Sequence, residues 1–409
     1  MSFVNKPLTD IMDCVRSSTA TYVDATGKIR TAGVNEPRVD YSSGQGRLLV
    51  EEARTNLLTW SEDFAKQGSG EWSVSGSTIN ASAIPAPAEG RVYQLWVEDT
   101  TNGRHRIAGQ AQSRFPASTG DSAVFYLHVK PKGRSILSFK IEGGASRETI
   151  YFDFVSNEST RGSSQGGGIS QIYHKSIPLP DGSYFVSFIW QFMDETPDWL
   201  FSLCMMDSLT PTGIQFGDPT YQGDGTSGIY IWGAQLEAAS TPSSYIPTEA
   251  SAVTRAADNV SRVLGDEFNA NEGVIYFKIK TAGISSAGVV VGTNLANMNF
   301  LLDTSAGTGF RLDLRDIGGG LNTLSGVGGS SDRIGAVEKF LFKYQNKIFY
   351  VFINGLFVGQ YPYTGNFNIT SLRLGSRSGV SGVANVDFED FKYFPKALSQ
   401  SECEELTRI

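Results

Sequence analysis

Carboxylates are the side chains of this chain that could do acid–base chemistry. Asp387 and Glu389 alternate along a predicted strand, so their side chains lie on the same face. Hydrolysis of a glycosidic bond needs two carboxylates that face each other across the sugar, one of them protonated. A second group, Asp194, Glu195 and Asp198, falls in a predicted turn, which favours Asp for local reasons. We favour solvated structural roles for both groups and predict no catalytic residue.

The chain has few side chains suited to nucleophilic catalysis or metal binding, because only three His and three Cys are present. No histidine belongs to a Gly-x-Ser-x-Gly or His-Glu-x-x-His motif, so we predict packing or surface roles for His105, His128 and His174. The cysteines are too far apart for a disulfide framework or a Cys-x-x-Cys metal site. We assign no metal ligand and no cofactor.

Aromatic residues, 11% of the chain, fit a binding function better. Sugars are recognised by aromatic faces that stack on C–H patches, together with a few polar groups. Most Trp and Tyr side chains of a β-sandwich belong to its core. Trp72 and Trp199, however, lie close to predicted loops, so we predict these two as glycan-binding residues. Trp232, flanked by Ile231 and Gly233 in a predicted strand, is expected in the core.

The elements that must position these residues are strands. Short β runs separated by Gly, Pro and Asp recur from about 60 to 250, and the pattern restarts at about 262. The strongest local signal is Asn354-Gly355 between two β runs, a hairpin turn. Ser399, with Glu402 three residues later, predicts the capping box of a short C-terminal helix. We predict an all-β chain of two antiparallel β-sandwich domains in tandem.

Four parts follow from these signals. Residues 1–60 contain small strands without a core of their own, and we interpret them as an attachment segment. A β-sandwich is predicted at 61–250, a Pro- and Ser-rich linker at 251–262, and a second β-sandwich at 263–409.

The C-terminal part resembles laminin-G/concanavalin A-like domains, in residues 386–394, 396–399 and 402–406 and in the Asn354-Gly355 hairpin and 372–375. The resemblance implies a jelly-roll sandwich of two curved antiparallel sheets. Hydrolases of that family carry a Glu-x-Asp-x-x-Glu type of strand, which 386–390 do not reproduce. Such sandwiches often hold calcium in oxygen-rich loops. Candidate donors, none of which we assign, are Asp303, Asp313, Asp316 and Asn322.

A second resemblance is to bacteriophage virion proteins. It lies in two groups of short sequence motifs. One group is at 52–58 and 60–64, and the other at 233–237, 244–248 and 253–258. In phage tail-fibre and head-fibre proteins these motifs bracket a carbohydrate-binding-module-like sandwich, which places that sandwich at 61–250. The resemblance also implies a homotrimer.

Composition excludes other classes. The chain has 34 basic and 42 acidic residues, a net charge of −8, which disfavours a nucleic-acid partner. The sequence has no apolar run that approaches 18 residues, so membrane insertion is not expected. The first residues lack the apolar centre of a signal peptide. We expect synthesis in the host cytoplasm and a final location in the virion.

Three functions remain open. The first is a non-enzymatic phage fibre or adhesin that attaches to other virion proteins through residues 1–60 and binds host-surface polysaccharide. The second is a structural head-fibre or capsid decoration protein without a glycan ligand. The third is a surface-polysaccharide depolymerase that uses Asp387 and Glu389.

Overall fold

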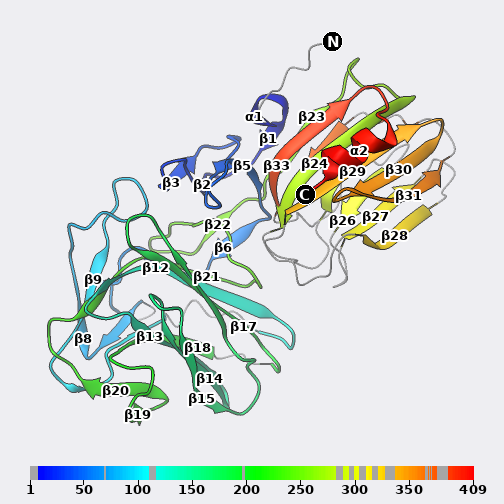
Figure 1. Ribbon diagram of the computed structural model, residues 1–409. Coiled ribbons are helices and arrows are strands. Elements are labelled where there is room, and N and C mark those ends of the chain that lie inside the picture. The colour runs from blue at the N-terminus through cyan, green and yellow to red at the C-terminus, as the bar shows by residue number, and fades with distance from the viewer. Residues whose placement is uncertain are drawn as a thin grey trace. The chain divides into compact units, whose positions relative to one another are not determined.

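The computed structural model describes residues 8–68, 71–109, 117–195, 199–281, 289–293, 299–303, 310–315, 321–327, 337–363, 367, 369, 371–374 and 386–409. Nearly all of its elements are strands, which confirms the all-β prediction (Figure 1).

Two compact units divide the chain, but they are not consecutive in it. Unit 1 consists of Met1–Thr26, Thr31–Ala53 and Ala256–Ile409, and unit 2 of Gly27–Arg30 and Arg54–Arg255. This division differs from the serial domains expected above, because strands from the N-terminal segment pair with strands of the C-terminal sandwich. Residues 13–15, 39–40 and 47–50 therefore belong to the large sheets of unit 1.

Unit 1 contains two seven-stranded antiparallel sheets. The first has the order β1 (Asp13–Val15), β23 (Asn259–Val263), β32 (Ser371–Leu374), β25 (Val289–Thr293), β26 (Asn299–Asp303), β27 (Phe310–Arg315), β28 (Leu321–Val327). The second has the order β31 (Leu356–Pro362), β30 (Ile348–Ile353), β29 (Val337–Gln345), β24 (Glu272–Thr281), β33 (Val386–Phe394), β5 (Arg47–Val50), β4 (Val39–Asp40). Unit 1 also contains α1 (Leu8–Ile11), β2 (Ala20–Val23) and α2 (Gln400–Thr407). Strand β3 (Ile29–Ala32), which pairs with β2, is divided between the two units.

The core of unit 1 lies between its two sheets. Alternate residues of β24, such as Phe277 and Ile279, pack there with Val260 of β23. The opposite face of β24 is also buried, because Tyr276 packs in a second cluster with Cys403 of α2. The helix begins with the predicted capping box of Ser399 and Glu402.

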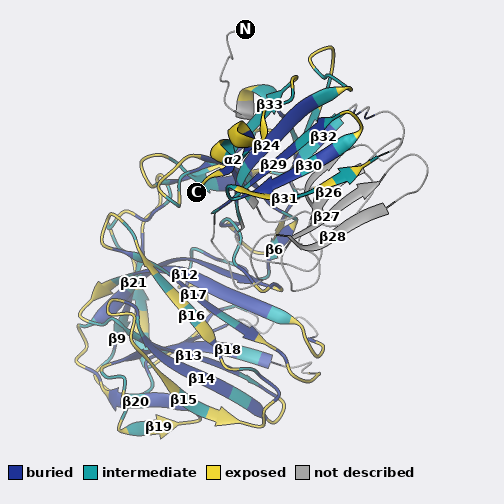
Figure 2. Ribbon diagram, turned by 45° about the vertical axis from the view of Figure 1, so that its right-hand side comes forward, coloured by how far each residue is buried: buried dark blue, intermediate teal, exposed yellow. Residues whose placement is uncertain are grey.

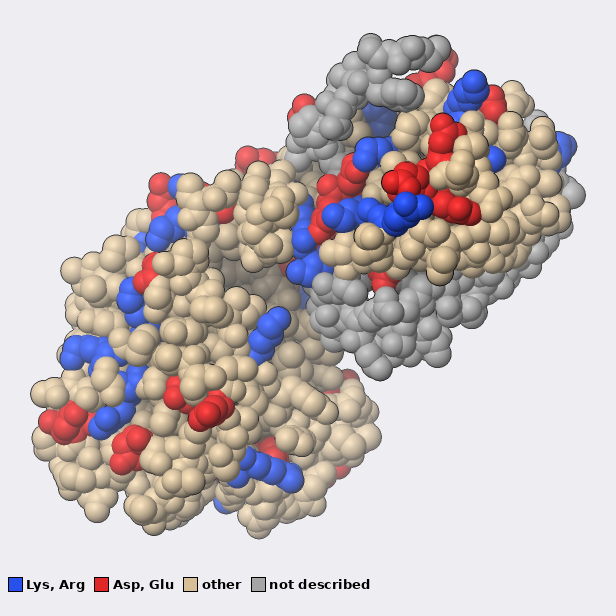
Figure 3. All heavy atoms as spheres, in the orientation of Figure 1, with Lys and Arg blue, Asp and Glu red and all other residues tan. Residues whose placement is uncertain are grey.

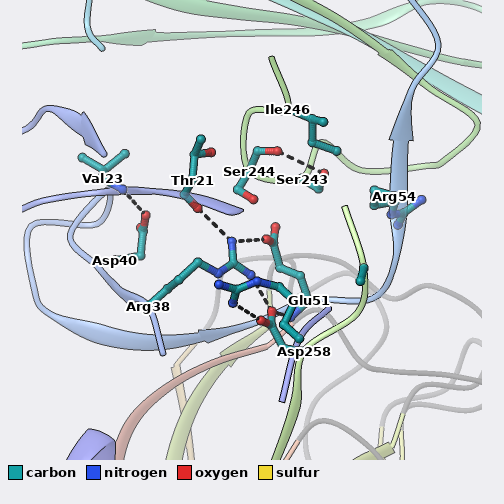
Figure 4. A network of polar contacts seen from close by, with 12 residues as sticks. Thr21, Val23, Arg38, Asp40, Glu51, Arg54, Ser243, Ser244, Ile246 and Asp258 are labelled. Atoms are coloured by element: carbon teal, nitrogen blue, oxygen red, sulfur yellow. Dashed lines mark hydrogen bonds and ion pairs between the residues drawn. The ribbon is translucent and has the colours of Figure 1, made fainter. Parts of the chain in front are cut away.

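Unit 1 contains a buried ionic network centred on Asp258, near the start of its segment Ala256–Ile409 (Figure 4). Asp258 accepts hydrogen bonds from Arg16, at 2.8 Å, and from Arg38. Arg38 also donates to Glu51 at 2.8 Å, and the Glu51 amide donates to Asp258 at 2.9 Å. The two arginine side chains are 0% exposed. Burial of these charges is tolerated because each cation has a carboxylate partner.

Unit 2 contains two six-stranded antiparallel sheets and two smaller ones. The sheet called here the β13 sheet has the order β15 (Ser159–Gln165), β14 (Ser146–Asp153), β13 (Ile136–Gly143), β18 (Trp199–Met206), β11 (Arg106–Ala108), β7 (Ser73–Ser75). The β12 sheet has the order β16 (Tyr173–Pro178), β17 (Tyr184–Gln191), β12 (Ser122–Lys132), β21 (Gly228–Glu237), β9 (Gln94–Glu98), β8 (Ser77–Asn80). The smaller sheets are β10 (Asn102–Gly103), β20 (Asp218–Gln222), β19 (Gly213–Gln215), and β22 (Val253–Arg255), β6 (Arg54–Asn56).

One hydrophobic core joins the two large sheets of unit 2, and the central strands β12, β13 and β17 are largely buried (Figure 2). In β13, Leu137, Phe139 and Ile141 point into this core. Ser138 and Lys140 alternate with them and belong to the outer face of the β13 sheet.

Residues 52–64 and 233–258 lie at the two ends of the stretch Arg54–Arg255 of unit 2. Strand β6 pairs with β22, so that Asn56 lies opposite Val253 and Arg54 opposite Arg255. The buried Asn56 amide group donates to the carbonyls of Ala234 (3.2 Å) and Ile246 (2.9 Å). These residues are therefore structural, because they hold both ends of the unit together.

Candidate functional site

The structure corrects the prediction for Trp72 and Trp199. Each side chain is 1% exposed and belongs to the core of unit 2. The Trp72 indole donates a hydrogen bond to the Trp60 carbonyl at 3.1 Å, and Trp199 packs edge-on against Trp190 at 5.8 Å. Proximity to a predicted loop was misleading, because both rings point inward. Neither presents a face to a sugar. Trp232 lies in the interior as predicted.

Among the described residues of unit 2, two aromatic side chains are instead largely exposed, Phe216 and Tyr173, each at 69%. Tyr173 lies on the edge strand β16. Phe216 was not predicted as a site residue. It lies between β19 and β20, where Gln215 pairs with Asp218, so Phe216 and Gly217 form a two-residue hairpin turn.

The backbone at this turn is strained. Phe216 has a φ of 52° and Gly217 a φ of 79°. A turn with two positive φ angles favours Asn-Gly, and a bulky residue in the left-handed region is an outlier that costs about 1–3 kcal/mol. The strain is not offset by burial, since the ring is exposed. Such outliers cluster at functional sites, which makes Phe216 the centre of the candidate site.

The strained turn is anchored to the outer face of the β13 sheet. Lys140 donates a hydrogen bond to the Phe216 carbonyl at 3.0 Å, and its ammonium lies 3.1 Å from Asp218. Ser202 of β18 also donates to Asp218, at 3.3 Å. Lys140 and Asp218 are 2% and 0% exposed, so the anchor is enclosed while the ring remains accessible.

Two partly exposed arginines flank the turn. The Arg104 guanidinium carbon lies 5.2 Å from the centroid of the Phe216 ring, in a cation–π contact. A Cβ on Gly217 would lie 2.7 Å from Cδ of Arg147, so this side chain passes directly beside the turn. The two arginine side chains are 24% and 25% exposed.

Two hydroxyls on the same face of the β13 sheet have no hydrogen-bond partner in the part of the chain that the structure describes. They are Oγ of Ser138 and Oγ1 of Thr149, in side chains that are 1% and 0% exposed. Thr149 lies directly opposite Lys140 in the sheet. Unpaired buried hydroxyls cost free energy and are uncommon in proteins.

The carboxylate pair predicted on β33 lies in an ion-pair network of unit 1. Arg47 of β5 contacts Glu389 and approaches Asp387 at 3.6 Å, and Lys278 of β24 also contacts Glu389. Burial and the nearby Asp40 raise the pKa of Asp387 to about 7, although Arg47 opposes this shift. Sequence analysis placed this pair in solvent, whereas the two side chains are only 16% and 10% exposed.

The three histidines pack against other side chains, as predicted. His105 is buried and its ring lies 4.5 Å from that of Tyr221. Burial lowers the pKa of His128 to about 4. His174 packs against Phe152, with ring centroids 4.3 Å apart.

Several predicted residues are not described in full. Asp194 and Glu195 are exposed, and Asp198 lies outside the described residues. Of the candidate calcium donors, Asp316 lies outside the described residues, and the side chains of Asp303, Asp313 and Asn322 are not described. Among the residues that are described, no group of His, Cys, Asp and Glu could hold a metal ion. None of the described helices is long and apolar enough to span a membrane.

Comparison with protein-family models and with curated proteins finds no match. Among solved structures, a SAP-like pentraxin from Limulus polyphemus is 10% identical over 33% of this chain and 69% of that chain, with a TM-score of 0.27. The receptor-binding domain of botulinum neurotoxin type G is 14% identical over 36% of this chain and only 39% of that one (TM-score 0.29). Domains LG4-5 of the mouse laminin α1 chain are 11% identical over 74% of this chain and 88% of that chain (TM-score 0.26).

Proposed function

We propose that this protein is a non-enzymatic bacteriophage fibre or adhesin that binds host-surface glycan at the Phe216 turn. The observation that carries the glycan-binding part is the exposed Phe216 ring on a strained turn anchored to a sheet. An aromatic ring on an anchored turn can stack on the C–H face of a sugar without the cost of ordering its backbone on binding.

The proposal that the chain is part of a virion rests on the resemblance of residues 52–64 and 233–258 to sequence motifs of phage fibre proteins. We propose that residues 1–60 attach the chain to other virion proteins. In support, β1 is an edge strand of one sheet of unit 1, and an edge strand can pair with a strand from another chain. A homotrimer is part of this proposal, which a measurement of mass in solution tests.

The non-enzymatic part is supported by the setting of Asp387 and Glu389. Arg47 bridges these two carboxylates, and Lys278 contacts the second, so the pair serves to hold β5 and β24 beside β33. Incubation with host polysaccharide is therefore expected to release no reducing ends. Release that disappears in Asp387→Asn or Glu389→Gln would establish a depolymerase instead.

An array of bacterial surface polysaccharides tests the binding site. The purified chain is expected to bind at least one glycan, and Phe216→Asn to abolish that binding. Tyr173→Asn is the matched control, because it removes an equally exposed aromatic ring from another sheet and should leave binding unchanged. Absence of binding to all glycans, or loss in the Tyr173 variant alone, would contradict the proposal.

A further inference from the structure

We propose that the glycan bound at the Phe216 turn is acidic, a polysaccharide whose sugar rings carry carboxylates. This inference rests on the proposed function and adds the chemical class of the ligand. It comes from the balance of charges around the turn, which is opposite in sign to that of the whole chain.

Asp218 is shared by three cations. Its carboxylate lies 3.1 Å from Lys140, 3.3 Å from Arg104 and 3.5 Å from Arg106. One carboxylate cannot neutralise three cations, and Asp218 is 0% exposed, so water does little to screen the remaining charge.

The second carboxylate at the turn is also shared. Glu142 of β13 lies 3.1 Å from Lys140 and 3.2 Å from Arg147. Together, four cations surround two carboxylates, which leaves an excess of two positive charges. The chain as a whole has a net charge of −8, so this excess is local. Figure 3 shows that most of the visible surface is uncharged, with charged side chains scattered over it.

The most accessible part of this excess is carried by the two arginines that flank the ring, since Arg106 is only 17% exposed. Lys140 is enclosed, whereas Arg104 and Arg147 are each about one quarter exposed. A guanidinium matches a carboxylate through two parallel hydrogen bonds and can do so beside an aromatic ring.

The distances at the turn favour a carboxylate attached to the stacked sugar itself. Arg104 is in contact with the Phe216 ring, and Arg147 lies beside Gly217. Because Arg104 lies over the Phe216 ring and Arg147 beside Gly217, a uronate that packs against the exposed part of this ring would bring its own carboxylate toward both guanidinium groups. A phosphodiester links two sugar rings, so its charge does not lie on the stacked ring. Its recognition does not require a guanidinium group so close to Phe216.

The experiment uses the full chain and polysaccharides printed in pairs, before and after carbodiimide–borohydride reduction of their carboxylates. Binding to native acidic polysaccharides is expected to fall at least about tenfold after reduction, because the charge is lost while the ring is retained. Binding is also expected to weaken in 1 M NaCl, where the screening length falls to about 3 Å.

The variants are Arg104→Gln and Arg147→Gln, each of which keeps a polar side chain. Each is expected to weaken binding to the acidic form about tenfold and to change binding to the reduced form by a clearly smaller factor. Arg91→Gln is the control, because it also loses an ion pair of unit 2, the 3.3 Å contact with Glu62, away from this turn. Thermal unfolding of each variant separates a loss of ligand contact from a loss of fold.

The outcomes separate the two proposals. Equal binding to native and reduced glycans would overturn the acidic ligand and leave glycan binding intact. Binding confined to phosphate-bearing glycans and insensitive to carboxyl reduction would also overturn it. Absence of binding to every glycan would overturn the proposed function and this inference together.

Discussion

The ammonium of Lys140 lies 3.1 Å from the carboxylate of Asp218, and the two side chains are almost completely buried. This contact joins the central strand of one sheet to the hairpin that carries Phe216. The positions of the exposed ring and of the two arginines beside it therefore depend on an enclosed ion pair.

Loss of Asp218 should cost more stability than loss of Lys140. Asp218→Ala leaves three cations without their shared carboxylate, and removal of one partner of a buried pair costs about 3–5 kcal/mol. Lys140→Met leaves Asp218 with Arg104 and Arg106, so the free energy of unfolding should fall less. Urea unfolding measures both values, and equal losses would show that Lys140 is the main partner.

Replacement of Phe216 should separate stability from binding. Phe216→Asn removes the strain of a bulky residue with positive φ, so the free energy of unfolding is expected to stay equal or to rise by about 1 kcal/mol. Ile214→Asn is the stability control, because it removes a neighbouring exposed apolar residue from a strand with ordinary geometry. A clear loss of stability in Phe216→Asn would mean that the ring has a packing role.

The ionic network of unit 1 should depend strongly on Asp258. Asp258→Ala removes the carboxylate that pairs with Arg16 and one of the two carboxylates that pair with Arg38. We expect a loss of about 3–5 kcal/mol in urea unfolding. Glu267→Ala, which removes the exposed pair with Arg262, should cost less than about 1 kcal/mol. Similar losses for the two variants would count against the network.

Asp387 predicts a pH dependence of stability. Its folded-state pKa of about 7 lies above the ordinary value of 3.8, so the folded chain binds this proton more tightly than the unfolded chain. Its contribution to stability is complete below pH 3.8 and is lost as the pH rises through about 7. Asp387→Asn should remove this part of the slope.

Urea unfolding at pH 5 and pH 8 checks this prediction by the difference between wild type and variant. Wild type should lose stability relative to Asp387→Asn between the two pH values. An unchanged difference would mean that Arg47 keeps the carboxylate ionised throughout.

Local signals predicted those parts of the fold that depend on neighbouring residues. Asn354 and Gly355 have φ angles of 51° and 82°, as the hairpin between β30 and β31 requires. The capping box of α2 could also be predicted from the sequence, because the Ser399 and Glu402 side chains each accept a hydrogen bond from the other residue's backbone N–H within one turn.

Features that depend on distant pairing could not be predicted in this way. The pairing of Leu48 with Phe388 joins strands from opposite ends of the chain, and no local pattern in residues 1–60 indicates it. Trp72 and Trp199 are near loops in sequence, but their burial depends on how those loops fold back. The Phe216-Gly217 turn was not predicted, and nothing local in the sequence indicates that Lys140 holds it.

The pairing of β6 with β22 places the first and last residues of Arg54–Arg255 side by side. Apart from Gly27–Arg30, unit 2 is thus a single stretch inserted into the chain of unit 1, and this stretch begins and ends at one pair of strands. The residues that bind Asp258 all lie outside Arg54–Arg255, so an exchange of this stretch by recombination would leave them in place. On the proposed function, one such exchange would give the protein a new glycan specificity and leave the ionic network of unit 1 unchanged.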